Sequence, residues 1–236
     1  MCITVQHKIP TGCRAIDEIL QGGIPSESVS LIYGEAETAK TTMAMQCTAN
    51  CAKEGTKTLF IDCDGTFSAK RLSQIASGKF EEIADLIIFM RPKDFREQSI
   101  IIDRLPSLLG QKFGLLVVDT VTSLYRARVA ESPKKAFELN RELNRQLASL
   151  AQIARTRRIA VLMVSQVRTA FKEDHVSIEP VATRVLKFWA DTIINLKPTE
   201  NSRIIKAILE KLLTKVQPTT CYLRIEESGL RDYLIH

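Results

Sequence analysis

The feature that most constrains this chain is the eight-residue segment GEAETAKT at positions 34–41. An apolar run at 29–33 precedes it and a helix-compatible run at 42–54 follows it, so the segment lies between a predicted strand and a predicted helix. Phosphate-binding loops in this context have a glycine, four residues and then Gly-Lys-Ser/Thr. The segment matches this pattern except at Ala39, where the pattern has glycine. The sequence therefore predicts a nucleotide-binding loop, and a turn with a solvated lysine is the alternative.

Each part of the predicted loop has a chemical role. Its backbone N–H groups and those of the following helix N-terminus would point at the phosphates, where the helix dipole favours an anion. Lys40 would reach the β- and γ-phosphates, and the Thr41 hydroxyl would bind Mg²⁺. The predicted nucleotide-binding residues are Gly34, Glu35, Ala36, Glu37, Thr38, Ala39, Lys40, Thr41 and Thr42.

Apolar runs that fit buried strands alternate with helical patterns along the chain. The strand candidates are 29–33, 58–62, 86–90, 115–119 and 159–164, with later strands at 204–209 and 221–225. A long amphipathic helix is predicted at 133–155, whereas 120–135 and 167–182 are predicted to be loops, the second of them mobile. This alternation predicts an α/β fold in one domain, residues 1–236, with a mostly parallel sheet covered on both faces and antiparallel strands at one edge.

Composition sets limits on the kind of protein. The net charge of +6 permits nucleic acid as a partner without indicating it. The sequence has neither an apolar run of membrane-spanning length nor a signal-peptide pattern, so we expect a cytoplasmic protein that does not contact a membrane. Its six cysteines are scattered without paired spacing, so the sequence predicts neither a metal site built from cysteines nor disulfides.

Polar residues follow two of the buried strand candidates. Asp119 ends the run LLVVD, and an aspartate there is the usual partner of a phosphate-binding lysine in holding Mg²⁺. The alternative is an aspartate that starts a turn. Gln166 follows the run at 159–164, where its amide would contact a γ-phosphate or only satisfy the strand end.

Four segments in order resemble the core of RecA-type recombinases, in the RadA branch of archaea and eukaryotes. They are TG with LQGGI near the start, FIDCDGTF at 60–67, LLVVDTVTSLYR at 115–126 and VLMVSQV at 161–167. The segment KFWADTIINL at 187–196 is similar to the RadB group, the short archaeal paralogues of that family. Like that group, the chain is expected to lack the N-terminal helical DNA-binding domain and the polymerisation linker of the full recombinase.

The resemblance implies a RecA-like core that binds ATP and Mg²⁺ through the loop, Thr41 and Asp119. Asp64 matches the glutamate that orients the attacking water, Gln166 the γ-phosphate sensor, and Arg71 the arginine that packs against adenine. The implied DNA-binding residues are Arg126 and Arg128 in a first loop and Arg168 and Lys172 in a second. The implied partners are single-stranded DNA, bound weakly, the main recombinase of the same cell, and further copies of the chain.

Three departures from the family pattern predict that nucleotide binding is retained and hydrolysis is weak. Ala39 replaces a loop glycine, and a helical φ at this position would be open to alanine. Asp64 is one methylene shorter than glutamate, so its carboxylate lies roughly 1–1.5 Å further back, and a misplacement near 1 Å costs about a hundredfold in rate. Residues 181–183 replace a Gly-Gly pair. We expect an accessory recombination protein that assists the main recombinase; the alternative is a nucleotide-gated interaction module without productive DNA binding.

Overall fold

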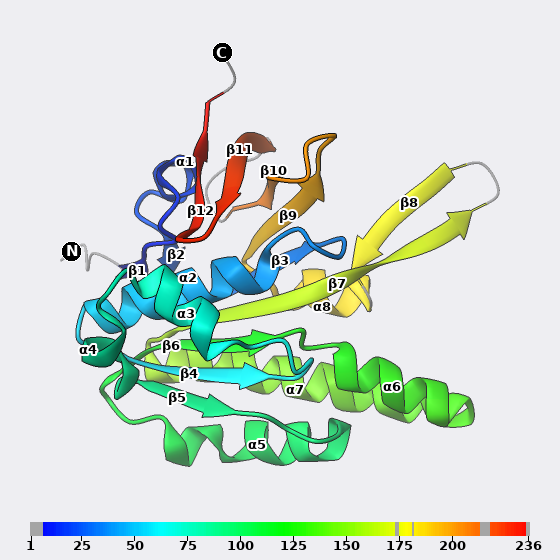
Figure 1. The fold of residues 1–236 in the computed structure, drawn as a ribbon. Helices are drawn as coiled ribbons and strands as arrows, with labels where there is room; N and C mark the ends of the chain where they lie inside the picture. The colour runs from blue at the N-terminus through cyan, green and yellow to red at the C-terminus, as the bar shows by residue number, and fades with distance from the viewer. Residues whose placement is uncertain (1–6, 173–174, 181, 213–217, 235–236) are drawn as a thin grey trace, which may run out of the picture.

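The computed structural model describes residues 7–172, 175–180, 182–212 and 218–234, and it has a central sheet with helices on both faces (Figure 1). The helices are α1 (Arg14–Ile19), α2 (Lys40–Lys53), α3 (Ala69–Ala76), α4 (Phe80–Ala84), α5 (Phe95–Leu108), α6 (Ser123–Glu131), α7 (Ala136–Arg157) and α8 (Thr183–Trp189), with a 3-10 turn at Pro133–Lys135. The strands are β1 (Lys8–Ile9), β2 (Ile24–Pro25), β3 (Val29–Gly34), β4 (Lys57–Asp62), β5 (Ile87–Met90), β6 (Phe113–Asp119), β7 (Ala160–Lys172), β8 (His175–Pro180), β9 (Thr192–Pro198), β10 (Ile204–Lys211), β11 (Thr219–Glu226) and β12 (Gly229–Tyr233).

The predicted sheet topology is confirmed. The strand order is β12-β11-β10-β9-β3-β7-β6-β4-β5. The six strands β9, β3, β7, β6, β4 and β5 run parallel to one another. Strand β10 pairs antiparallel with β9, and β11 and β12 continue the sheet in antiparallel pairs. Within the described ranges, no helix combines the length and apolarity needed to cross a membrane.

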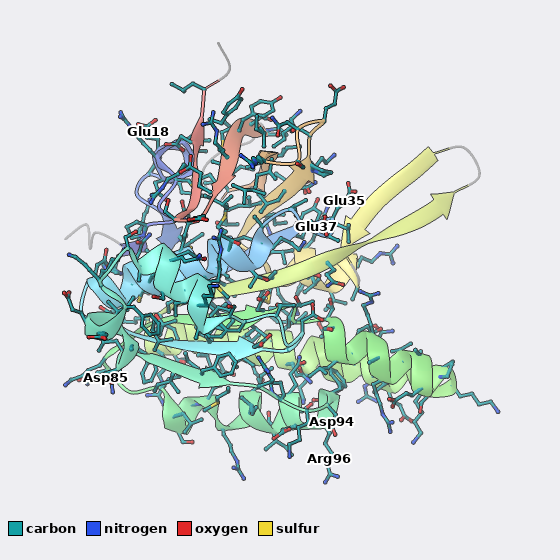
Figure 2. The ribbon with its side chains drawn as sticks, in the orientation of Figure 1. Glu18, Glu35, Glu37, Asp85, Asp94 and Arg96 are labelled. Carbon is teal, nitrogen blue, oxygen red and sulfur yellow. The ribbon has the colours of Figure 1, made fainter. Side chains whose placement is uncertain are left out.

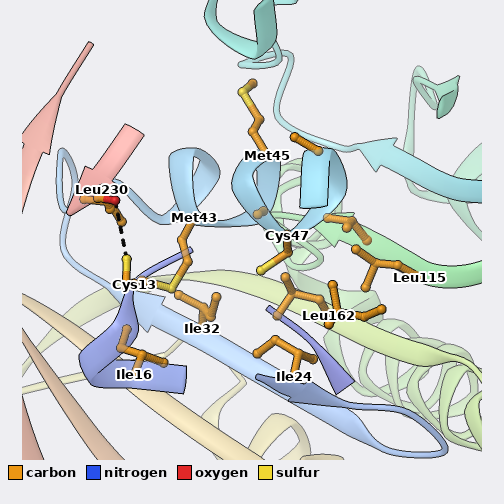
Figure 3. Packing of buried hydrophobic residues seen from close by; sticks show 14 of the residues in the cluster. Cys13, Ile16, Ile24, Ile32, Met43, Met45, Cys47, Leu115, Leu162 and Leu230 are labelled. Carbon is orange, nitrogen blue, oxygen red and sulfur yellow. Dashed lines mark hydrogen bonds between the residues drawn. The ribbon is translucent and has the colours of Figure 1, made fainter. Parts of the chain in front are cut away.

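The core lies in two layers because the side chains of each strand alternate between the faces of the sheet. In β6, Leu115 and Val117 pack in the layer under α2, whereas Leu116 and Val118 pack in the layer under α5 and α7. Figure 3 shows Met43 and Cys47 of α2 in the first layer. A strand buried on both faces reads as a continuous apolar run, which explains why these strands are recognisable from the sequence.

Two segments predicted to be loops have regular structure. Residues 123–131 form α6, on which Tyr125 alone of the described residues is buried, so the helix has no apolar stripe for a sequence pattern to reveal. The segment at 167–182, predicted to be a loop, contains a β-hairpin, in which β7 pairs with β8 from Val167↔Pro180 to Lys172↔His175. This hairpin projects from the rest of the sheet (Figure 1).

Smaller corrections concern element ends. The long helix begins at Ala136 rather than 133. The short elements α4, β1 and β2 and the edge strand β12 are not predicted from the sequence. Each of them is too short, or too exposed on one side, to show a periodic pattern.

A buried amide connects three segments that are distant in sequence. Gln46 on α2 donates from Nε2 to the Thr11 carbonyl (3.3 Å) and the Leu230 carbonyl (3.1 Å), and its Oε1 accepts from the Leu230 N–H (2.5 Å). Gly229 permits this approach, because a Cβ there would lie 2.7 Å from the Gln46 side chain. Gln46 therefore holds the segment around Thr11 and the strand β12 against α2.

We expect Gln46→Leu to destabilise the protein, because it leaves the buried Leu230 N–H without its acceptor. An unsatisfied buried group costs about 1–3 kcal/mol, which corresponds to a fall in Tm of roughly 2–10 °C for a chain of this size. The matched control is Gln152→Leu, an exposed glutamine on α7. Thermal unfolding measures both, and an equal Tm for the two variants would contradict the assigned role of Gln46.

Candidate nucleotide-binding site

Four neighbouring strands bring the predicted site residues together at one edge of the sheet, where β3, β4 and β6 end and β7 continues into its hairpin. Gly34 at the end of β3 is level with Gln166 of β7, and Asp62 at the end of β4 is level with Asp119 of β6. Open α/β sheets bind ligands outside the carboxyl ends of their strands. The predictions from separate stretches of sequence therefore converge on one place.

The loop between β3 and α2 closes around the ammonium of Lys40. This side chain is only 8% exposed, and it donates to the Glu35 carbonyl and to Thr38 Oγ1 (3.4 Å). Burial lowers the pKa of Lys40, while the nearby carboxylates of Asp119, Asp64 and Glu35 oppose that shift. Figure 2 labels Glu35 on this loop, beyond the end of β3. The site therefore has a buried cation beside the N-terminus of a 14-residue helix, the arrangement that favours a phosphate.

Gly34 has no room for a side chain. A Cβ at this position would lie 2.1 Å from the Leu196 carbonyl oxygen of β9 and 2.8 Å from Thr38 Oγ1. The glycine that begins the loop is thus required by close packing of the backbone against the neighbouring strand.

The expectation that Ala39 takes a helical φ is wrong. Ala39 has φ 59° and ψ 27°, in the left-handed region, and Glu37 also has a positive φ of 61°. The chain reverses direction here between β3 and α2, and this turn requires the conformation that glycine adopts without strain. For a residue with a side chain the left-handed region costs roughly 1–2 kcal/mol, so the loop keeps its shape at a cost in stability.

Asp119 has the surroundings of a metal ligand. It is fully buried at the end of β6, and burial raises the pKa of its carboxyl to about 6; Asp62 and Asp64 add to the rise, whereas the Thr41 and Thr120 hydroxyls oppose it. Its Oδ2 atom accepts no hydrogen bond from the described residues. A buried carboxylate oxygen without a donor, beside the Thr41 hydroxyl, is the kind of oxygen ligand that Mg²⁺ takes. The residues therefore fit a magnesium ion held by Thr41 and Asp119.

Asp62, also at this edge, has a structural role. Its carboxylate accepts hydrogen bonds from the N–H groups of Gly65 (2.8 Å) and Thr66 (3.2 Å), and it forms an ion pair with Arg91 Nη2 (2.8 Å). These bonds shape the loop that carries Asp64. Arg91 was not identified from the sequence, although its position directly after β5, the neighbouring strand, was an available signal.

The structure brings Asp64 and Gln166 into contact. Gln166 Nε2 donates to Asp64 Oδ2 (3.1 Å), and Ser123 Oγ donates to Asp64 Oδ1 (2.6 Å). Arg126 Nη1 donates in turn to Gln166 Oε1 (2.8 Å). Ser123 was missed in the sequence, because nothing there shows that α6 begins next to Asp64.

The remaining predicted residues lie around this centre. Arg71 on α3 donates to the carbonyls of Glu226 and Glu227 (both 2.7 Å) in the turn between β11 and β12, so its contact with adenine stays a prediction. Arg128 on α6 pairs with Glu131 (2.9 Å). Arg168 and Lys172 lie on β7 within the hairpin, and their side chains are outside the described part of the structure.

Comparisons with known proteins show which family the chain resembles. The Rad51 family model matches residues 4–233. The DNA repair and recombination protein RadB of Methanococcoides burtonii is 33% identical and is matched over 97% of this chain and 99% of its own length. That of Thermococcus gammatolerans is 35% identical, over 95% and 98%. A crystal structure of the RadB recombinase superposes with a TM-score of 0.80 at 30% identity, covering 96% of this chain and all of that one.

We expect Ala39→Gly to stabilise the protein by about 1 kcal/mol, because glycine adopts the left-handed conformation without strain. This gain corresponds to a rise in Tm of roughly 2–4 °C. The matched control is Ala36→Gly in the same loop: Ala36 is outside the group of residues with positive φ, so glycine there should lower the Tm. If both variants lower the Tm by the same amount, the strain assigned to Ala39 is absent.

We expect Asp119→Asn to stabilise the ligand-free protein at pH 7.5. The folded pKa of about 6 lies above the unfolded value of 3.8, so the stability contributed by the protonated carboxyl is complete below pH 4 and is lost as the pH rises through 6. The variant should therefore exceed the wild type by about 1–3 kcal/mol at pH 7.5 and match it below pH 4.

Denaturant unfolding at a series of pH values measures this difference, with Asp85→Asn at the exposed end of α4 as the control. Added ATP and Mg²⁺ should reverse the order by stabilising the wild type more than Asp119→Asn. If the free energy of unfolding differed between the wild type and Asp119→Asn by the same amount at every pH, titration of the Asp119 carboxyl would not be the cause of the difference.

Proposed function

The chain belongs to the Rad51 family, and on that premise we propose that it is a cytoplasmic accessory protein of DNA repair and recombination. It binds ATP with Mg²⁺, hydrolyses the nucleotide slowly and binds single-stranded DNA weakly. It assists the main recombinase of the same cell and associates with further copies of itself. Its relatives in Methanococcoides burtonii and Thermococcus gammatolerans, which are DNA repair and recombination proteins, support the recombination role.

One observation supports the nucleotide part above all others. Lys40 and Asp119, from two different strand–loop segments, place a buried cation and a buried carboxylate oxygen without a donor at one edge of the sheet. A triphosphate would supply oxygens for Lys40, and its Mg²⁺ would complete the shell of Asp119. When bound, the magnesium nucleotide would supply negative phosphate oxygens to the Lys40 ammonium and a cation to the Asp119 carboxylate.

Slow hydrolysis is supported by the contacts of Asp64. Both of its carboxylate oxygens already accept a hydrogen bond from the protein, one from Ser123 and one from Gln166. A residue that orients or deprotonates water must itself lie within hydrogen-bond reach of that water. The short aspartate side chain and these competing donors both act against that contact.

The alternative function is a nucleotide-gated interaction module without productive DNA binding. The observation in its favour is that both described DNA-binding candidates already have partners, Arg126 with Gln166 and Arg128 with Glu131. The dependence of binding on salt separates the two functions. Contacts to the phosphates of single-stranded DNA give a slope of about −0.7 per contact in a plot of log affinity against log salt, and absence of binding at low salt favours the module.

The test of the proposed function is ATP binding and turnover by the purified protein, with and without single-stranded DNA at low salt. Lys40→Ala should lower ATP affinity by about 10- to 100-fold, the loss of a charge-assisted hydrogen bond. Lys53→Ala, at the opposite end of α2, is the matched control. Unchanged affinity in Lys40→Ala would remove the central claim, whereas fast DNA-stimulated turnover by the wild type would mean that Asp64 is fully effective.

A further inference from the structure

Helix α6 contacts both residues that the proposed function assigns to hydrolysis. Ser123, its first residue, donates to Asp64 Oδ1 (2.6 Å), and Arg126 donates to Gln166 Oε1 (2.8 Å). Gln166 donates in turn to Asp64 Oδ2 (3.1 Å). Residues three apart lie on the same face of a helix, so Ser123 and Arg126 close a ring of four side chains with α6 as one side.

This ring fixes the orientation of both groups. A glutamine amide has a donor end and an acceptor end, and here Arg126 faces the acceptor end while Asp64 faces the donor end. Asp64 has one donor for each oxygen and lies beside the N-terminus of the nine-residue α6, where the helix dipole favours a carboxylate. Removing a donor on α6 would therefore free Gln166 or Asp64 to rotate.

We propose that Ser123 and Arg126 are positioning residues, through which α6 sets the orientation of Asp64 and Gln166 and relays the binding of a phosphodiester to them. This inference rests on the proposed function. Arg126 is exposed and its partner is a neutral amide oxygen. A phosphate adds its negative charge and can accept two parallel N–H bonds from a guanidinium, whereas a neutral amide oxygen offers no charge to pair with. A phosphodiester bound at Arg126 would thus take the guanidinium from Gln166 and release the amide.

Arg128 provides the contrast within the same helix. It is also exposed, but its guanidinium pairs with Glu131 of the same helix (2.9 Å) rather than with Gln166 or Asp64. An anion that binds Arg128 alone would leave the ring intact. Substituting either arginine removes one positive charge from α6, but only substitution of Arg126 also removes the contact to Gln166. Comparing the two variants therefore distinguishes the effect of charge from the effect of this contact.

The first experiment follows the side-chain NH₂ resonance of Gln166 by NMR, assigned through its loss in Gln166→Leu. We expect Arg126→Ala and Ser123→Ala to shift this resonance and Arg128→Ala to leave it in place. Ser123→Thr retains the hydroxyl and should restore the wild-type position. An oligothymidylate should shift the resonance in the wild type but not in Arg126→Ala.

An unmoved resonance in Arg126→Ala, or an equal shift in Arg128→Ala, would overturn the inference. So would an oligothymidylate-induced shift that persists in Arg126→Ala. This readout does not require ATP hydrolysis, so it separates the inference from the proposed function. Failure of the wild type to bind ATP would refute the proposed function while the ring remained measurable.

The second experiment measures the steady-state ATP turnover of the same variants. Ser123→Ala should raise kcat by about tenfold, because it removes one of the two donors that keep Asp64 from the attacking water; this stays within the roughly hundredfold effect of a 1 Å displacement. KM should remain within about twofold of the wild type, and Ser123→Thr should keep the wild-type kcat. An unchanged or lower kcat in Ser123→Ala, or an equal gain in Ser123→Thr, would show that Ser123 does not act by positioning Asp64.

Discussion

The register of the parallel strands around β3 and β6 is the constraint on which the site depends. It sets Gly34 level with Gln166 and Asp62 level with Asp119, so the loop, the amide and the carboxylates meet at one edge. The register is fixed by the core, because a slip of one residue would turn every side chain of a strand to the other face. The apolar runs thus determine the geometry of polar residues that contribute nothing to the core.

Burial acts on the two central charges of this edge in opposite directions. It lowers the pKa of Lys40 and raises that of Asp119, so in each case the neutral form gains. The Asp62 carboxylate forms an ion pair with Arg91 and accepts hydrogen bonds from backbone N–H groups. The charges of Lys40 and Asp119 are compensated only in part, by nearby carboxylates for Lys40 and by the Thr41 and Thr120 hydroxyls for Asp119. In the proposed function a magnesium nucleotide satisfies both at once, whereas ATP without the metal would place its negative charge near Asp119.

The sequence predicted the parts of the site that lie on buried strands or in the loop pattern, and it failed where contacts depend on exposed elements. Lys40, Asp119 and Gln166 each follow an apolar run, so their common edge was predictable. The contacts of Ser123 and Arg126 were not, because α6 has little buried surface to reveal its helical period. The left-handed φ of Ala39 was likewise out of reach, since a helix start alone would have allowed a helical value.

Three of the eight described residues other than glycine that have a positive φ lie at the site. Besides Glu37 and Ala39, Thr120 has a positive φ of 54°, although β-branched residues strongly avoid that region. Such strain persists only where the surrounding structure over-determines the conformation, and here Gly34 against β9 and Lys40 inside the loop do so. This strain lowers the stability of the fold. In the proposed function, weak hydrolysis is attributed to the short Asp64 side chain, both of whose carboxylate oxygens accept hydrogen bonds from the protein.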